Sequence, residues 1–160
     1  MFGINSNVRK EVKVRDVFNN MKKSLDDSGY NYQVDQERMV IRTGFQGDDL
    51  PIPVVMYVDD EHPFITVATQ LDIEVPETSF GKALELINEL NSGIRFGLFV
   101  LDCDNRMINF RYNERIVDET NKIDHYKELL ALVVTTTDRY DGELKQKLEK
   151  KGVVPNNMYG

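Results

Sequence analysis

Residues 83–102 read ALELINELNSGIRFGLFVLD, and within this stretch a helical pattern gives way to a strand pattern. A helix is predicted over residues 79–91, and its apolar positions share one face: Phe80, Ala83, Leu84, Ile87 and Leu90. Gly93 is a typical helix terminator. The runs Phe96–Asp102 and Arg106–Tyr112 then flank Asp104-Asn105, which predicts two strands joined by a two-residue hairpin turn.

Upstream of this stretch the sequence predicts one helix and three strands. The helix runs from Val8 to Leu25, and the strands are Met39–Phe45, Val54–Val58 and Phe64–Leu71. Short polar turns between the strands indicate an antiparallel meander. The prolines of Pro51-Ile52-Pro53 lack backbone donors, so we expect that end of its strand at a sheet edge or outside the sheet.

Downstream, a long helix begins near Ile123. Its apolar positions alternate spacings of three and four residues: Ile123, Tyr126, Leu130, Val133, Thr137, Tyr140, Leu144 and Leu148. The β-branched run Leu132–Thr137 favours a strand on its own, but the length of the pattern favours the helix. We therefore predict one α+β domain over residues 1–152, with a mostly antiparallel sheet, and a flexible tail over residues 153–160.

The composition narrows the class of protein. The 160 residues are 41% apolar and 29% charged, which excludes a disordered chain. No apolar run approaches the ~20 residues of a membrane span. A net charge of −7 argues against binding to a nucleic-acid backbone. The single cysteine excludes an internal disulfide, and we expect a cytoplasmic protein without membrane contact.

The sequence contains no recognisable catalytic or metal-binding pattern. His62 and His125 are far apart and are expected at the surface or half-buried. Asp102-Cys103-Asp104 resembles the start of a calcium loop, but Arg106 and Met107 occupy positions that such a loop needs for a ligand and a glycine. A hairpin end explains these residues better, with Cys103 half-buried. We therefore expect no enzyme, no cofactor and no metal.

Residues 80–144 resemble a known family. The helix carries Leu86, Asn88 and Asn91 at its end, and a strand, an acidic turn, a second strand and the long helix follow. This order is similar to that of the YbjN-like bacterial sensory transduction regulators, which share the fold of the class I type III secretion chaperones. The resemblance implies that fold and supplies no catalytic residues. Chaperones of this fold are acidic homodimers that hold an extended partner segment in apolar grooves.

From the resemblance we expect a non-enzymatic, chaperone-like or regulatory domain that binds a partner polypeptide. The alternative is a regulatory module that senses a small ligand between sheet and helix. An exposed apolar patch for the partner is expected where the first helix meets the first strands: Val14, Phe18, Met21, Ile41 and Val54. The same residues could equally form the core, and the sequence leaves both interpretations open.

We also expect a homodimer, because small sheets with open edges tend to pair and the second helix is apolar on more than one side. The predicted interface lies on that helix and the following strand, at Leu86, Leu90, Leu98 and Val100.

Overall fold

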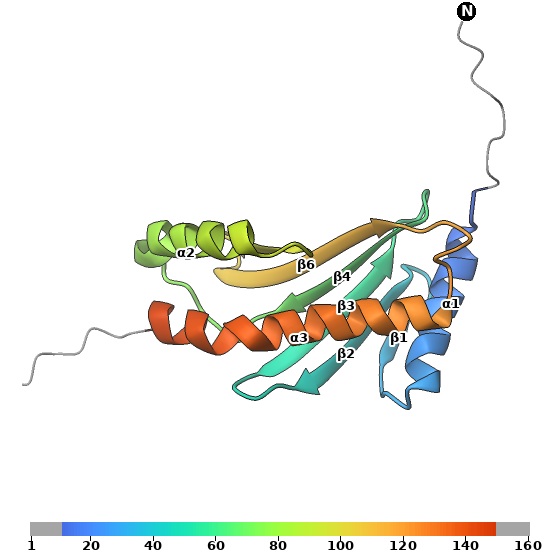
Figure 1. The fold of residues 1–160 in the computed structure, drawn as a ribbon, viewed down its shortest axis with the longest axis horizontal. Coiled ribbons are helices and arrows are strands. Elements are labelled where there is room, and N and C mark those ends of the chain that lie inside the picture. Colours follow the sequence, from blue (N-terminus) through green and yellow to red (C-terminus); the bar gives the residue numbers. More distant parts are fainter. Residues whose placement is uncertain (1–10, 150–160) are drawn as a thin grey trace, which may run out of the picture. The chain divides into compact units, whose positions relative to one another are not determined.

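The computed structural model describes residues 11–149 (Figure 1). The elements along the chain are α1 (Val14–Asp27), β1 (Gln33–Asp35), β2 (Val40–Gln46), β3 (Pro51–Val58), β4 (Phe64–Gln70), η1 (Glu77–Ser79), α2 (Phe80–Gly93), β5 (Leu98–Asp102), β6 (Met107–Arg115) and α3 (Ile123–Leu148). This order confirms the predicted α+β class and the long final helix. The expected tail over residues 153–160 and the expected helix start at Val8 lie outside the described residues.

The strands form one six-stranded sheet in the order β1-β2-β3-β4-β6-β5. The outer pairs β1–β2 and β5–β6 are antiparallel. The short strand β1 was not predicted, because its three residues are too few to show an alternating pattern. The edge position expected for Pro51 and Pro53 is wrong, since β3 lies third in the sheet. Pro51 is the first residue of β3, where a missing backbone donor is tolerated.

The chain divides into two compact units, and each is described by itself. Among the described residues, the first unit comprises residues 11–43, Val55–Val67 and Asn113–Leu132, and the second comprises Gly44–Val54, Ala68–Tyr112 and residues 133–149. Each unit contains strands of the sheet and a part of α3. The single domain expected over residues 1–152 stays a prediction.

In the first unit, α1 buries one face: Val17, Phe18, Met21, Ser24 and Leu25. The helix ends where Gly29 adopts a left-handed φ of 70°, which allows the Tyr30 N–H to reach the Leu25 carbonyl at 3.0 Å. The Asn20 side chain donates to the Asn121 carbonyl at 3.1 Å and so joins α1 to the segment before α3. The buried Tyr126 of α3 donates its hydroxyl proton to the side chain of the same Asn121 at 2.7 Å.

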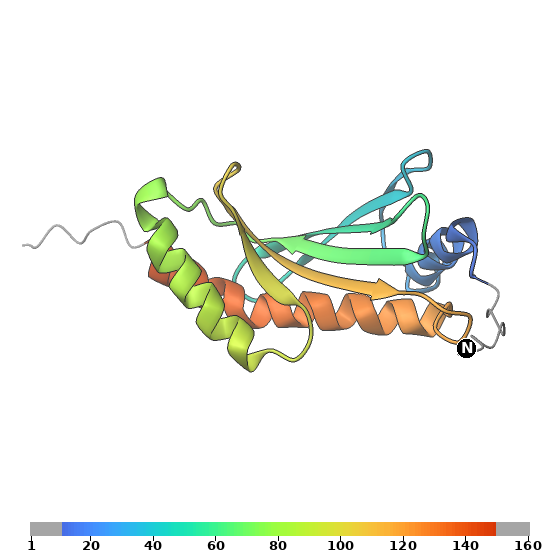
Figure 2. The same ribbon diagram turned by 90° about the horizontal axis from the view of Figure 1, so that it is seen from above.

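In the second unit, the later half of α3 packs against strands and lies beside α2, as Figures 1 and 2 show from two directions. The buried residues of this half are Val133, Thr137, Asp141, Leu144 and Leu148. Thr137 donates to the Val133 carbonyl at 2.8 Å, and its hydroxyl lies 2.6 Å from that of buried Thr69. The β-branched run is therefore helical, because this face can be buried against the sheet.

The β5–β6 hairpin has a longer turn than the sequence predicts. Asp102 pairs with Met107 in the register, so four residues, Cys103–Arg106, form the turn, and the predicted two-residue turn is wrong. The Asp102 carboxylate accepts hydrogen bonds from the backbone and side chain of Asn105, at 3.1 and 2.8 Å. These bonds hold the pKa of Asp102 below its ordinary value. Arg106 closes the turn with a φ of 56°.

Candidate functional site

Helix α2 is apolar on more of its surface than the fold covers. Its buried residues are Ala83 and Ile87. Leu84 is 52% exposed, and Leu86 and Leu90 are half-buried. At ~100° per residue, Leu84 lies on one flank of the buried line, and Leu86 and Leu90 lie on the other. The helix therefore presents apolar side chains on both flanks.

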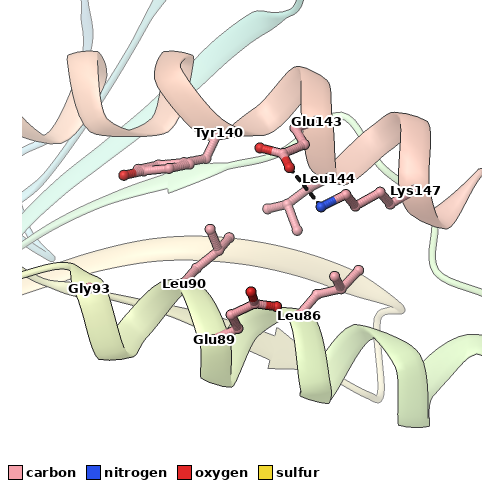
Figure 3. Close-up of a pocket in the computed structure, with 8 residues that line it drawn as sticks. All are labelled: Leu86, Glu89, Leu90, Gly93, Tyr140, Glu143, Leu144 and Lys147. Atoms are coloured by element: carbon pink, nitrogen blue, oxygen red, sulfur yellow. Dashed lines mark hydrogen bonds and ion pairs between the residues drawn. The ribbon is translucent and has the colours of Figure 1, made fainter.

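A groove of about 240 Å³ separates α2 from the later half of α3 (Figure 3). Leu86 and Leu90 point into it from α2, and Tyr140 and Leu144 line it from α3. At its rim, the exposed Lys147 ammonium donates to the Glu143 carboxylate at 2.6 Å. We call this site the α2–α3 groove. Its apolar floor and charged rim suit an apolar side chain of another polypeptide.

Strand β5 also carries exposed apolar side chains. Leu98 is 45% exposed and Val100 is half-buried, whereas Phe99 between them is buried. Asn91, in the last turn of α2, donates to the Phe99 carbonyl at 3.0 Å and accepts from the Phe99 N–H at 2.7 Å. In the sequence, Asn91 stands out only through the resemblance to the family, and this contact is not predicted from it. The position of Asn91 near the helix end is typical of a capping residue, but it does not indicate that the side chain binds the backbone of Phe99.

The four residues predicted for a dimer interface belong to two elements that contact each other. Leu86 and Leu90 belong to α2, Leu98 and Val100 belong to β5, and the two elements are in contact. All four are at least partly exposed. The side chains are therefore accessible for association, and the dimer itself stays a prediction.

The predicted apolar patch for a partner is wrong as an exposed surface. Phe18, Met21, Ile41 and Val54 each have 0% exposure, and Val14 is half-buried. Phe18, Met21, Ile41 and Val54 form part of the core, which is the second of the two interpretations that the sequence leaves open. The competing signals could not be separated from the sequence, because core and groove use the same residue types.

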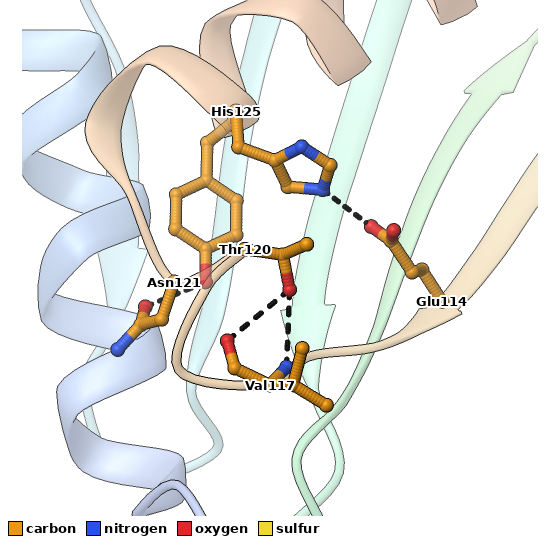
Figure 4. A network of polar contacts seen from close by, with 6 residues as sticks. Glu114, Val117, Thr120, Asn121 and His125 are labelled. Atoms are coloured by element: carbon orange, nitrogen blue, oxygen red, sulfur yellow. Dashed lines mark hydrogen bonds and ion pairs between the residues drawn. The ribbon is translucent and has the colours of Figure 1, made fainter.

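His125 belongs to a polar network at the start of α3 (Figure 4). Its Nε2 lies 2.7 Å from a Glu114 carboxylate oxygen, and both side chains are 22% exposed. Thr120 accepts the Val117 N–H at 3.0 Å and thereby shapes the loop before the helix. The network joins β6 to α3, and it confirms the expectation that His125 is half-buried.

The other polar residues considered in the sequence lie in turns. Exposed His62 donates its backbone N–H to the Asp59 carboxylate at 2.8 Å, and this bond lowers the pKa of Asp59. The surface position expected for His62 is confirmed. Cys103 is exposed, so its expected half-buried position is wrong, because the longer hairpin turn carries it into solvent. These contacts account for the acidic loops as turn structures.

A cluster of three carboxylates lies where the β2–β3 turn meets α3. Asp138 accepts the Asp48 N–H at 2.8 Å, and Asp49 approaches Gly142. Asp141 is 1% exposed, and its Oδ1 has no hydrogen-bond partner among the described residues. Burial, with the charges of Asp138 and Asp49, raises the pKa of Asp141 to about 6.

No group of three His, Cys, Asp or Glu side chains within residues 11–149 is placed to hold a metal ion. A larger hollow of about 670 Å³ lies beside η1, and five of its seven lining residues are polar or charged: Glu74, Pro76, Thr78, Ser79, Arg106, Leu148 and Glu149. None of the helices in the described part of the chain combines the length and apolar character that a membrane crossing requires.

Comparison with known proteins agrees with this architecture. Three solved structures each cover 81–82% of the chain. YbjN from E. coli matches with a TM-score of 0.62 and 10% sequence identity, over 91% of its own chain. The ExsC–ExsE complex matches with a TM-score of 0.59 and 10% identity over 96% of its chain, and the HopA1–SchA chaperone–effector complex with a TM-score of 0.55 and 13% identity over 98% of its chain. At these identities the likeness shows the fold alone, which is that of YbjN and of type III secretion chaperones. A search of curated proteins found no match. A family model described as "Putative bacterial sensory transduction regulator" matches residues 19–146. The chain therefore belongs to the YbjN family.

Proposed function

We propose that the protein is a non-enzymatic binding protein that holds a partner polypeptide on α2. The observation that carries this proposal is the uncovered apolar surface of α2, where Leu84 is 52% exposed and Leu86 and Leu90 open onto the α2–α3 groove. Exposed apolar surface on a folded protein commonly marks an interaction site. Two solved structures with this fold are complexes, ExsC–ExsE and the chaperone–effector pair HopA1–SchA, which supports a polypeptide as the ligand.

The size of the groove supports a polypeptide over a small ligand. Its volume of about 240 Å³ is below the ~300–1,000 Å³ that usually encloses a small molecule. It can accept one or two apolar side chains, while the rest of the partner lies along the exposed flank of α2. The charged pair of Glu143 and Lys147 at the rim can form hydrogen bonds with the backbone of such a segment.

A second copy of the chain is the other candidate for this surface, through Leu86, Leu90, Leu98 and Val100. These four residues are apolar and at least partly exposed, and two-fold dimers are the commonest closed assembly. If two copies pair through α2, a partner would bind to the dimer at the flank that remains free. Light scattering at high micromolar protein tests this step, and a monomer there would contradict it.

Position-specific photocrosslinking tests the partner site. A photoreactive phenylalanine derivative is placed at Leu90 in the groove or, as the control, at Asn88 on the exposed face of the same helix. A discrete adduct from position 90 but not from position 88 is expected. Identical adducts from both positions, or none from position 90, would contradict the proposed site, and an adduct of twice the chain mass would identify the second copy.

A charge substitution gives an independent readout. Leu90→Asp places a carboxylate in the α2–α3 groove, and Asn88→Asp makes the same charge change on the exposed face. Because Leu90 is only half-buried, both variants should retain the far-UV dichroism of the wild type. With the photoreactive residue moved to Leu86, which lines the same groove, Leu90→Asp should abolish the crosslink and Asn88→Asp should preserve it. Survival of the crosslink in a folded Leu90→Asp protein would refute the groove as the binding site.

A further inference from the structure

The strand β5 lies at one end of the sheet, and one of its edges therefore has no neighbouring strand within the described residues. Its other edge pairs with β6 in an antiparallel register that joins Leu98 to Arg111, Phe99 to Phe110 and Val100 to Asn109. An unpaired edge presents backbone N–H and C=O groups that can add a strand from another chain. Apolar edge strands carry this risk, and Leu98, Val100 and Leu101 of β5 are apolar and at least partly exposed.

The register identifies which backbone groups face the open edge. In an antiparallel pair, the N–H and C=O of one residue point to the same side, and successive residues alternate sides. The N–H and C=O of Phe99 are both bound by Asn91 of α2, so they point away from β6. Leu101, two residues on, therefore turns its groups to the same edge.

The side chain of Asn91 meets Phe99 as a neighbouring strand would. A carboxamide carries one carbonyl acceptor and an N–H donor on the same carbon, which is the chemistry of a peptide group. It accepts from the Phe99 N–H at 2.7 Å and donates to the Phe99 carbonyl at 3.0 Å. An incoming strand would need the Phe99 N–H and carbonyl for its central pair of hydrogen bonds. It would therefore have to displace the Asn91 side chain from both.

The sequence of β5 explains why such a block is useful. Leu98–Leu101 is an uninterrupted apolar run with high β propensity and no charge, which is typical of segments that self-associate through edge pairing. Proteins commonly protect such edges with prolines, charges or bulges. In this chain the protection comes from the last turn of the neighbouring helix.

We propose that Asn91 closes the β5 edge to strand addition by the β5 of a second copy of this chain. Association of the intact protein then uses side chains of α2 and β5, while the main chain of β5 stays closed. This inference does not rest on the proposed partner-binding function, because it follows from the sheet order and the two hydrogen bonds.

The test compares two isosteric substitutions on the same helix. Asn91→Leu keeps the shape of the side chain and removes both hydrogen bonds. Asn88→Leu adds the same apolar group at an exposed position. A fluorescent synthetic peptide of residues 97–102 serves as the probe for strand addition. At least a tenfold tighter binding of the peptide to Asn91→Leu than to the wild type is expected, with Asn88→Leu equal to the wild type.

Peptide-dependent hydrogen exchange at the β5 edge provides the readout that a merely structural role of Asn91 would not move. In Asn91→Leu without peptide, the Phe99 amide should exchange faster than in the wild type, and added peptide should restore protection at both Phe99 and Leu101. A folded Asn91→Leu protein that binds the peptide no better than the wild type would overturn the proposal. If Asn91→Leu does not fold, Asn91→Asp, which retains an acceptor but loses the donor, is judged by the same comparison.

Discussion

Replacing Asp141 by asparagine should stabilise the protein at neutral pH. Asp141 is 1% exposed, and its Oδ1 lacks a hydrogen-bond partner among the described residues. The charges of Asp138 and Asp49 oppose its ionisation, and the backbone N–H groups of Gly142 and Asp141 offset only part of that cost. Burying a charge without a compensating partner is costly. The asparagine amide removes that charge, and its N–H groups can donate to the two neighbouring carboxylates.

The size of the gain follows from the pKa. The folded protein holds the pKa of Asp141 at about 6, against 3.8 for the ordinary group. Each pKa unit corresponds to ~1.4 kcal/mol, so the charged form costs about 3 kcal/mol of folding free energy above pH ~6. The folded state binds the proton more tightly than the unfolded state. The contribution of this group to stability is therefore greatest below pH ~4, falls as the pH rises towards 6, and is constant above that.

Urea unfolding at pH 4.0 and pH 7.5 measures the effect. These two values lie on either side of the isoelectric point of about 4.9. Asp141→Asn should exceed the wild type by up to about 3 kcal/mol at pH 7.5 and by less than about 1 kcal/mol at pH 4.0. Asp60→Asn, in an exposed loop, makes the same change in net charge and should stay within about 0.5 kcal/mol at both values.

Two results would refute this reasoning. The first is an Asp141→Asn protein that is less stable than the wild type at pH 7.5. The second is a stability difference that does not change between the two pH values, because a group whose pKa is raised by folding must produce such a change. A carboxyl titration of Asp141 by nuclear magnetic resonance gives the pKa directly and should show a midpoint well above 4.

Gly47→Ala should lower the free energy of unfolding in urea by about 1–3 kcal/mol, because the new Cβ would lie 2.7 Å from the Leu50 carbonyl oxygen. Gly81→Ala, in open space at the start of α2, should raise it by up to about 1 kcal/mol. Thr137→Val should cost about 1–3 kcal/mol by the same method, because it leaves the buried Thr69 hydroxyl without its partner at 2.6 Å; a cost below 0.5 would contradict that pairing. His125→Ala should cost about 0.5–1.5 kcal/mol through the lost contact with Glu114, and His62→Ala should be neutral in thermal unfolding; equal effects would refute the distinction between the two histidines.

The periodic elements could be predicted from the sequence because their signals are local. Helix α3 shows a stripe of apolar residues along its whole length, and the spacing alone outweighs the β-branched run at residues 132–137. The stretch from residue 83 to residue 102 contains both the terminating glycine of α2 and the apolar run of β5. Resemblance in the same region led to the family that the comparison then showed.

The candidate site could be predicted only in part. Leu86 and Leu90 are predicted because α2 is apolar on more than one side, and Leu98 and Val100 because small sheets with open edges tend to pair. All four side chains are at least partly exposed. Phe18 and its neighbours were equally plausible as a surface, since an apolar residue carries no mark of what will cover it. Only packing in three dimensions decides whether such a side chain is core or groove.

By itself, then, the sequence determined the α+β class, the order of most helices and strands, and the apolar excess of α2, because each depends on spacing within a short segment. The tertiary structure decided the central place of β3, the burial of Asp141 among Asp138 and Asp49, and the contact of Asn91 with Phe99. Strand order and the carboxylate cluster depend on residues that are far apart along the chain. The Asn91 contact spans only eight residues, but it requires the chain to turn back so that a helix end meets an open strand edge. No local pattern encodes where two such groups will meet.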